Sequence, residues 1–156
     1  MGSTLTVDNI VGATTAANVK LPAGCILQVL EGSFATQTDI ASSSYADTSL
    51  TVTITPKFAS SKVYVITNLH MYINGTGLLG LNVLRGSTQI VEAQKAVGFA
   101  DNTTGVAAIT KLDSPNTTSA TTYKVQVKYT ALGGGSTARI NQQNGGSRIT
   151  VMEVAG

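Results

Sequence analysis

Apolar and polar residues alternate with a period of two along much of this chain, and β-branched residues fill most of the apolar positions. Such a period places successive side chains on opposite faces of a strand. In residues 50–55 one face carries Leu50, Val52 and Ile54 and the other carries only Thr, which predicts a half-buried strand with a hydroxyl surface. Since no segment longer than about ten residues shows the 3.6-residue stripe of an amphipathic helix, we expect no long helix.

Turn residues break the alternating segments at short intervals. Pro56 ends the first of these strands, and Gly86 lies in the turn of a hairpin that we predict from residues 79–85 and 88–92. Short strands separated by turn signals are typical of a β-sandwich or a β-barrel, so we expect an all-β fold. We predict further strands over residues 25–30, 62–74, 123–130, 138–140 and 148–154.

The first 22 residues differ from the rest of the chain. Leu5, Val7, Ile10 and Val19 are scattered among Thr, Ala, Asn and Gly and are too few to build a core of their own. We therefore divide the chain into an extended arm, residues 1–22, and one compact domain, residues 23–156. The arm must pack on another surface, and other copies of the chain are the first candidates.

Hydroxyl and amide groups must supply most of the wetted surface. Charged residues make up 12% of the chain, about half the usual share, whereas Thr, Ser, Asn and Gln make up a third of it. The net charge of +2 is spread without a cluster of Lys and Arg, so nucleic acid is not an expected partner. No apolar run approaches the roughly eighteen residues of a membrane helix, and the first residues lack the features of a signal peptide. We therefore expect neither membrane insertion nor export.

Two glycine-rich segments look like nucleotide-binding motifs but are better explained as loops. Residues 75–80 match the dinucleotide fingerprint G-x-G-x-x-G letter for letter. That motif works only where a strand leads into a helix, and here residues 79–84 continue as a strand. Residues 133–136 lack the Lys-Ser/Thr pair and the helix of a phosphate loop. We therefore expect no cofactor.

Candidate catalytic and metal-binding residues are few. His70 is the only imidazole, has no carboxylate beside it in the sequence and is predicted to pack on a sheet face. Cys25, the only Cys, has no basic neighbour, so we expect a buried structural thiol. The Asp residues of the turn-like segments form no dense calcium-binding motif. We therefore predict no metal site and no enzymatic activity.

Five short segments, in their order along the chain, carry a resemblance to known proteins. They are Ser3-Thr4-Leu5-Thr6-Val7-Asp8-Asn9-Ile10, Leu21-Pro22-Ala23-Gly24, Ile54-Thr55-Pro56 with Ser60-Ser61-Lys62-Val63, Val83-Leu84-Arg85-Gly86-Ser87-Thr88-Gln89-Ile90 and Ser147-Arg148-Ile149-Thr150-Val151-Met152-Glu153-Val154. Together they resemble the short tail-fibre and appendage proteins of tailed bacteriophages, a type common among phages of marine bacteria. The resemblance implies an antiparallel jelly-roll sandwich of the C1q/tumour-necrosis-factor type that forms a homotrimer, preceded by an amino-terminal segment that binds the virion.

The residues themselves agree with the implied trimer. Predicted strands 62–74 and 148–154 carry apolar side chains on both faces, so a second buried surface is expected in addition to the core. A closed ring of three copies would cover that surface and bring three arms side by side. Three copies of His70 would then lie near the axis, where they could bind an anion, a metal or water. The candidate interface residues are Tyr64, Ile66, His70 and Tyr72, and the arm residues that would share a core are Leu5, Val7, Ile10 and Val19.

The sequence therefore predicts a non-enzymatic structural protein of a bacteriophage virion. It would be a homotrimeric knob, fibre or decoration-type appendage, attached through residues 1–22 to other tail or capsid proteins. It lacks a shaft of repeats, and the resemblance supplies no catalytic residues. Outer loops would contact a glycan or a protein of the host surface, or simply decorate the particle. The candidate outer loops are residues 36–49, 74–79, 100–105, 113–121 and 133–136.

A cellular carbohydrate-binding or adhesion module of the same fold is the alternative. The absence of Trp and the small number of Tyr weaken it, because sugars usually stack on aromatic faces. A hydrolase ranks third, since the eight carboxylates include no evident acid/base pair.

Overall fold

The computed structural model describes residues 21–99, 102–132 and 136–156. Within those ranges the chain is almost entirely β-structure, and the helical element is a short 3-10 turn, η2 (Gln142–Asn144). None of the helices in the described ranges has the length and apolarity that a membrane crossing requires. The all-β prediction is confirmed. The arm residues Leu5, Val7, Ile10 and Val19 lie outside the described residues.

The strands pair as a set of nested hairpins. The described residues form β1 (Ile26–Phe34), β2 (Thr38–Asp39), β3 (Ala46–Ile54), β4 (Lys62–Asn74), β5 (Gly77–Arg85), β6 (Thr88–Phe99), β7 (Thr103–Asp113), β8 (Thr121–Leu132), β9 (Thr137–Ile140) and β10 (Ser147–Val154). Strand β5 pairs with β6, β4 with β7, β3 with β8 and β1 with β10, each pair antiparallel. A nested antiparallel ribbon that wraps around a core is a jelly roll, which is the predicted fold.

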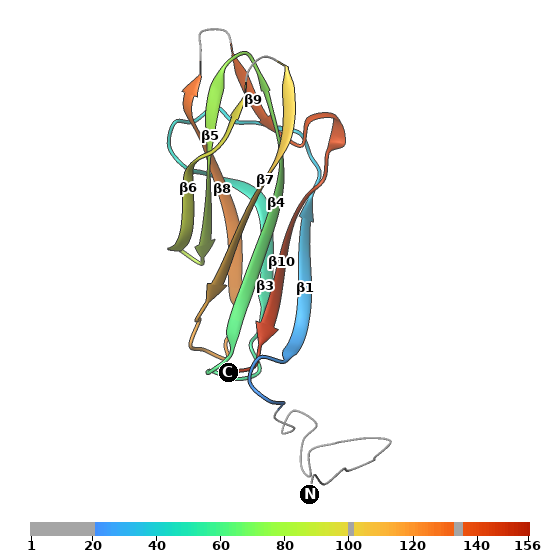
Figure 1. Ribbon diagram of the computed structural model, residues 1–156, viewed down its shortest axis with the longest axis vertical. Helices are drawn as coiled ribbons and strands as arrows, with labels where there is room; N and C mark the ends of the chain where they lie inside the picture. Colours follow the sequence, from blue (N-terminus) through green and yellow to red (C-terminus); the bar gives the residue numbers. More distant parts are fainter. Residues whose placement is uncertain (1–20, 100–101, 133–135) are drawn as a thin grey trace, which may run out of the picture.

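Two sheets face each other in the described part of the chain (Figure 1). The first sheet has the order β1-β10-β4-β9-β2, with β7 on the other side of β4, and the second sheet has the order β3-β8-β5-β6. Strands β10 and β9 follow each other along the same edge of β4: β10 pairs with residues 62–68 and β9 with residues 71–74. The turn that joins β9 to β10 therefore lies beside β4 at residues 69–70.

One apolar core fills the space between the sheets. Leu50, Val52 and Ile54 of β3 are buried and the intervening Thr residues are exposed, as the alternation predicts. Strand β4 has the predicted bounds and buries the predicted face, which includes Val63 and Leu69. Each fully buried side chain of this size contributes about 1.5–3 kcal/mol relative to an exposed one. The fold is therefore stabilised by the residues from which it was predicted.

Some of the turns lie where the turn residues predicted them. Gly86, between β5 and β6, has the positive φ of 57° that the hairpin requires. Several segments expected in loops are strands instead: residues 46–49 belong to β3, 77–79 to β5 and 103–105 to β7. The loop predictions were wrong there because Gly and Ser occur inside these strands as well as between them.

Both ends of the described chain lie at the same end of the sandwich (Figure 1). Gly24 N–H donates to the carbonyl of Ala155 at 2.8 Å, and Ala155 N–H donates to the carbonyl of Cys25 at 2.8 Å. We refer to this end, with residues 21–25 and 155–156, as the terminal end. The opposite end, with residues 36–42 and the turn between β4 and β5, is the distal end. Of the candidate outer loops, 36–49 and 74–79 reach the distal end, whereas 113–121 follows β7 at the terminal end (Figure 1).

Candidate functional site

The outer face of the first sheet, which is turned away from the second sheet, carries an uncovered apolar row. Val29 lies opposite Met152, Met152 opposite Tyr64, and Tyr64 opposite Leu112 in the strand register. Residues that lie directly opposite each other are on the same face of a sheet, so the row crosses β1, β10, β4 and β7. Val29 is 52% exposed and Leu112 is 54% exposed. These four residues form the apolar row.

Further apolar side chains extend the row along the strands. Ile66 follows Tyr64 on the same face of β4 and is partly exposed. Ile26 lies opposite Val154 and is 54% exposed, and Val106 of β7 is 62% exposed. Single apolar residues are ordinary on a protein surface, whereas a contiguous apolar patch marks a binding surface. The outer face of the first sheet is therefore the candidate interface.

The outer face of the second sheet carries polar side chains that already have partners. Asp47 accepts hydrogen bonds from Lys124 Nζ at 2.9 Å and from Gln126 Nε2 at 2.8 Å. These two bonds hold the pKa of the Asp47 carboxyl below its usual value. The hydroxyls of Thr53 and Thr122 lie 2.8 Å apart and share a hydrogen bond. The outer face of the first sheet also carries an exposed ion pair, with Arg148 Nε 3.5 Å from Glu31 Oε1, so the two faces differ in the apolar row and not in the pairing of their charges.

The predicted interface residues occupy two different environments. Tyr64 and Ile66 lie on the open part of the outer face and are partly exposed. Tyr72 is 9% exposed within the single chain, and its hydroxyl donates to Asn102 Oδ1 at 2.9 Å. An already covered ring adds little area to an interface. The sequence pattern did not indicate Val29 or Leu112, which are the most exposed members of the apolar row.

His70 lies beside the turn between β9 and β10. The backbone N–H of His70 donates to Ser147 Oγ at 3.0 Å, and its backbone carbonyl accepts from the backbone N–H of Asn141 at 3.0 Å. Residues at the two ends of the turn therefore take the place of a strand partner at this position. Gly145 packs so closely on the imidazole that a Cβ at this position would overlap Nδ1. This confirms the prediction of a His packed on a sheet face, and the meeting of three His70 rings near an axis stays a prediction.

Asn141 fixes this turn in place. It is fully buried and has a positive φ of 56°. Its Nδ2 donates to the carbonyls of Phe34 at 3.0 Å and Thr36 at 3.3 Å, and its Oδ1 accepts from Ser147 Oγ at 2.6 Å. The amide thus joins the end of β1 to the start of β10.

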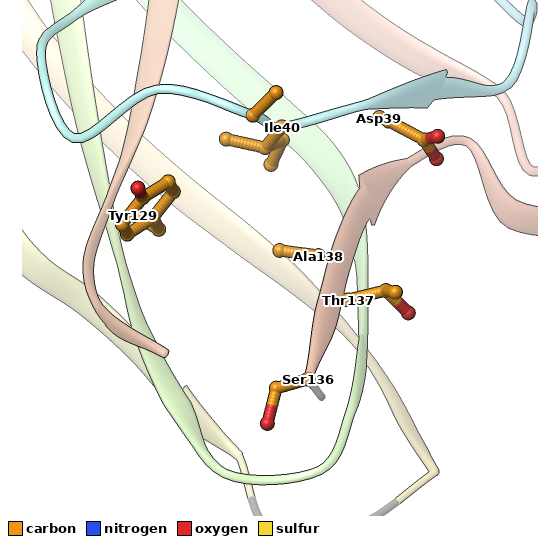
Figure 2. Close-up of a pocket in the computed structure, with 7 residues that line it drawn as sticks. Asp39, Ile40, Tyr129, Ser136, Thr137 and Ala138 are labelled. Atoms are coloured by element: carbon orange, nitrogen blue, oxygen red, sulfur yellow. The ribbon is translucent and has the colours of Figure 1, made fainter. Parts of the chain in front are cut away.

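A pocket opens between the two sheets at the distal end (Figure 2). Figure 2 shows Tyr129 of β8 and Ala138 of β9 on opposite walls, with Ile40 beside them. The segment that holds Ile40 is bonded to both sheets: Ile40 N–H donates to the Ala138 carbonyl at 2.8 Å, and Tyr129 N–H donates to the Ser42 carbonyl at 3.0 Å. The volume of this distal pocket is about 370 Å³, and it is lined by Asp39, Ile40, Ala41, Tyr129, Ser136, Thr137 and Ala138.

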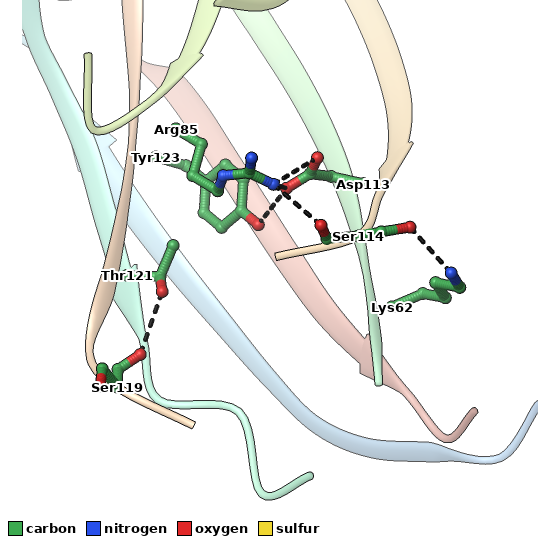
Figure 3. A network of polar contacts seen from close by, with 7 residues as sticks. All are labelled: Lys62, Arg85, Asp113, Ser114, Ser119, Thr121 and Tyr123. Carbon is green, nitrogen blue, oxygen red and sulfur yellow. Dashed lines mark hydrogen bonds and ion pairs between the residues drawn. The ribbon is translucent and has the colours of Figure 1, made fainter. Parts of the chain in front are cut away.

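A polar network joins the sheets toward the terminal end (Figure 3). Asp113 of β7 accepts from Arg85 Nη1 at 2.8 and 2.9 Å and from the Tyr123 hydroxyl at 2.7 Å. Arg85 and Tyr123 belong to the second sheet. Burial, and then the hydrogen bond to Asp113, raise the pKa of Tyr123. Because Tyr123 is fully buried and Asp113 almost so, this network stabilises the sandwich rather than binding a ligand.

The remaining sequence candidates are resolved by their positions. In the described ranges, no group of three or more His, Cys, Asp and Glu side chains could hold a metal ion. Residues 75 and 76 form the turn between β4 and β5, as predicted, whereas residues 77–80 belong to β5, so these glycines lead into a strand and not into the helix that the dinucleotide motif requires. Cys25 is partly exposed, so the expectation of a buried thiol was wrong. It lies just before β1, where only the backbone is paired.

Comparison with known proteins does not assign the chain to a family. No family model matches it, and no curated protein matches it. The crystal structure of the insecticidal delta-endotoxin Cry8Ea1 from Bacillus thuringiensis is similar with a TM-score of 0.40 and 18% identity, over 78% of this chain and 19% of the toxin. The structure of infectious bursal disease virus, Gx strain, is similar with a TM-score of 0.46 and 10% identity, over 83% of this chain and 38% of the viral chain. The chain thus spans less than half the length of either protein, and neither likeness assigns a function.

Proposed function

We propose that this chain is a structural protein of a virus particle: a homotrimeric jelly-roll appendage of a bacteriophage, attached to the particle through residues 1–22. The observation that carries the proposal is the apolar outer face of the first sheet. We infer the threefold symmetry and the attachment to a phage particle from the resemblance of the sequence to phage appendage proteins.

The difference between the two outer faces supports self-association. The apolar row crosses four strands, and Ile26, Ile66 and Val106 extend it. The outer face of the second sheet is polar where Asp47 contacts Lys124 and Gln126. Burial of an apolar face against copies of itself removes it from water, at about 25 cal/mol for each Å². A closed ring of three copies gives every copy the same burial and leaves no open apolar face.

The position of the termini supports attachment at one end. Residue 21 enters the sandwich at the terminal end, beside the C-terminus (Figure 1). In a closed trimer three arms would therefore leave from the same end. The distal end, with its pocket, would then face away from the particle.

The first test of the trimer is the solution mass of the full chain by light scattering after gel filtration. We expect a mass of three 16.0 kDa chains for the wild type. Leu112→Asp places a charge in the apolar row and is expected to lower the mass, because burial of an unpaired carboxylate is unfavourable. Thr53→Asp, on the polar face of the second sheet, is the matched control and should keep the wild-type mass. A monodisperse wild-type monomer at micromolar concentration would contradict the proposal.

Attachment to the particle needs a separate test. We expect peptides of the chain in purified phage particles when the full chain is produced, and none when residues 1–22 are deleted. If the deleted chain still trimerises, the arm acts as the anchor rather than as the oligomerisation element. Equal incorporation of both chains would contradict an anchor in the arm.

The carbohydrate-binding or adhesion module remains the second candidate because of the distal pocket beside Tyr129. A wild-type chain that is monomeric at micromolar concentration and binds a glycan without any particle would favour it over the appendage.

A further inference from the structure

The distal pocket has the size and the lining of a small-molecule site. Its volume of about 370 Å³ falls at the lower end of the range in which proteins bind small ligands, about 300–1,000 Å³. Ile40, Ala138 and the ring of Tyr129 supply the apolar part of its wall, whereas Asp39, Ser136 and Thr137 line it with polar groups. Tyr129 packs partly on the core, so the ring is held in place by the chain itself. The pocket can therefore receive a ligand with an apolar face.

Neutral hydroxyl groups lie at the edge of the pocket. Tyr129 and Ser136 contribute them, and the Ser136 hydroxyl also packs closely on Gly75. The nearest charges cancel, because Arg139 Nε lies 2.7 Å from Asp39 Oδ1. Figure 2 shows the Asp39 carboxylate and the Thr137 hydroxyl turned away from Tyr129. The pocket therefore favours a neutral ligand that can exchange hydrogen bonds with hydroxyl groups.

We propose that the distal pocket binds a neutral saccharide unit, with the C–H face of the sugar ring against Tyr129. A pyranose combines the two properties that the pocket selects, since one face is apolar and hydroxyls surround it. That the pocket faces away from a virus particle rests on the proposed function, whereas the binding of a saccharide does not depend on it. A single contact of this kind is weak, and three copies in one appendage, with many appendages on a particle, raise the effective affinity. The partner is therefore a surface that repeats the sugar, such as a polysaccharide of a cell surface.

The test is saturation-transfer difference NMR on the full chain with a panel of neutral methyl glycosides at millimolar concentration. We expect transfer to ring protons from at least one of them. Tyr129→Ala is expected to weaken its binding about two- to twelvefold, since aromatic contacts of this kind contribute about 0.5–1.5 kcal/mol. Tyr129→Phe keeps the ring and should keep most of the signal.

A second variant guards against a folding defect in Tyr129→Ala. Ala41→Gln places a longer side chain at an exposed position that lines the pocket, and it should also reduce transfer. Ala59→Gln, at an exposed position of the loop between β3 and β4, is the matched control and should not. The Leu112→Asp chain should bind the sugar as the wild type does, so loss of the trimer and loss of the pocket are distinguishable. Three results would overturn the proposal. They are the absence of saturation transfer to every neutral glycoside, transfer to acidic sugars alone, and equal transfer in the wild type and Ala41→Gln.

Discussion

Arg85 and Asp113 form an ion pair that crosses from one sheet to the other, with Arg85 Nη1 2.8 Å from Asp113 Oδ2. The same carboxylate accepts the hydroxyl of Tyr123, which is fully buried. The pair joins β5 to β7, two strands that share no hydrogen-bonded ladder. It therefore links the two sheets by a charged contact in addition to the apolar core.

We expect Asp113→Asn to lower the free energy of unfolding by about 1–3 kcal/mol, because it leaves Arg85 without its counter-charge and weakens the bond to Tyr123. Urea unfolding followed by circular dichroism measures the loss. The matched control is Asp47→Asn, which breaks an exposed pair with Lys124 and should cost about 0–1 kcal/mol. Equal losses in the two variants would show that the pair between the sheets has no special role.

Glu153 makes stability depend on pH. The carboxylate is fully buried and accepts from the Lys57 N–H at 2.7 Å and Gln28 Nε2 at 2.6 Å. Burial alone would raise the pKa of Glu153, but hydrogen bonds from Gln28 Nε2 and from the backbone N–H groups of Lys57 and Phe58 outweigh burial and lower it. The ionised form therefore stabilises the fold above the unfolded pKa of about 4.3, and that stabilisation is lost as the pH falls through the lower folded pKa.

We expect Glu153→Gln to cost about 2–3 kcal/mol at neutral pH, because the amide must place an N–H group against backbone donors. The difference from wild type should shrink on acidification, as the wild-type carboxylate becomes protonated. Unfolding free energies at neutral and acidic pH measure this. Glu31→Gln removes an exposed carboxylate 3.5 Å from Arg148 and is the control, with an expected loss of about 0–1 kcal/mol. A Glu153→Gln deficit that does not change with pH would contradict the assignment.

The strands that could be predicted are those with one apolar and one polar face. Residues 50–55 alternate cleanly because one face is buried and the other meets water. Strand β7 escaped prediction because its inner positions include Gly105 and Lys111, while its outer positions include Val106 and Leu112. Because apolar residues occupy outer positions and polar or small residues occupy inner ones, the sequence of β7 lacks the alternation that marks a half-buried strand.

The candidate sites were predictable only in part, for a related reason. Tyr64 and Ile66 were indicated because a single strand carries apolar residues on both faces. The distal pocket could not be predicted, since its walls come from residues 39–41, Tyr129 and residues 136–138, which meet only after β8 and β9 enter different sheets. The covering of Tyr72 likewise depends on a contact with Asn102, distant in sequence.

Gly32 marks a close approach between β1 and β3. A Cβ at this position would overlap the carbonyl oxygen of Thr51, which is backbone and cannot move away by changing a rotamer. We expect Gly32→Ala to lower the free energy of unfolding by about 2–4 kcal/mol, as overpacking does when backbone must shift. Gly86→Ala is the control: a Cβ there meets no atom within 4 Å, so only the positive φ of 57° is unfavourable, at about 1 kcal/mol. Thermal unfolding compares the two, and a milder effect at Gly32 would show that β1 and β3 can separate without loss.

Asn141 combines a left-handed backbone with three side-chain hydrogen bonds, and two substitutions separate these contributions. We expect Asn141→Ala to cost about 3–4 kcal/mol, from the lost bonds to Phe34, Thr36 and Ser147 together with backbone strain. Asn141→Gly relieves the strain and should recover about 1 kcal/mol of that loss. Asn116 has a similar φ of 52° in an exposed loop, so Asn116→Ala should show the strain alone. Urea unfolding of the four proteins measures these differences. If Asn141→Ala cost no more than Asn116→Ala, the turn beside His70 would not depend on the buried amide.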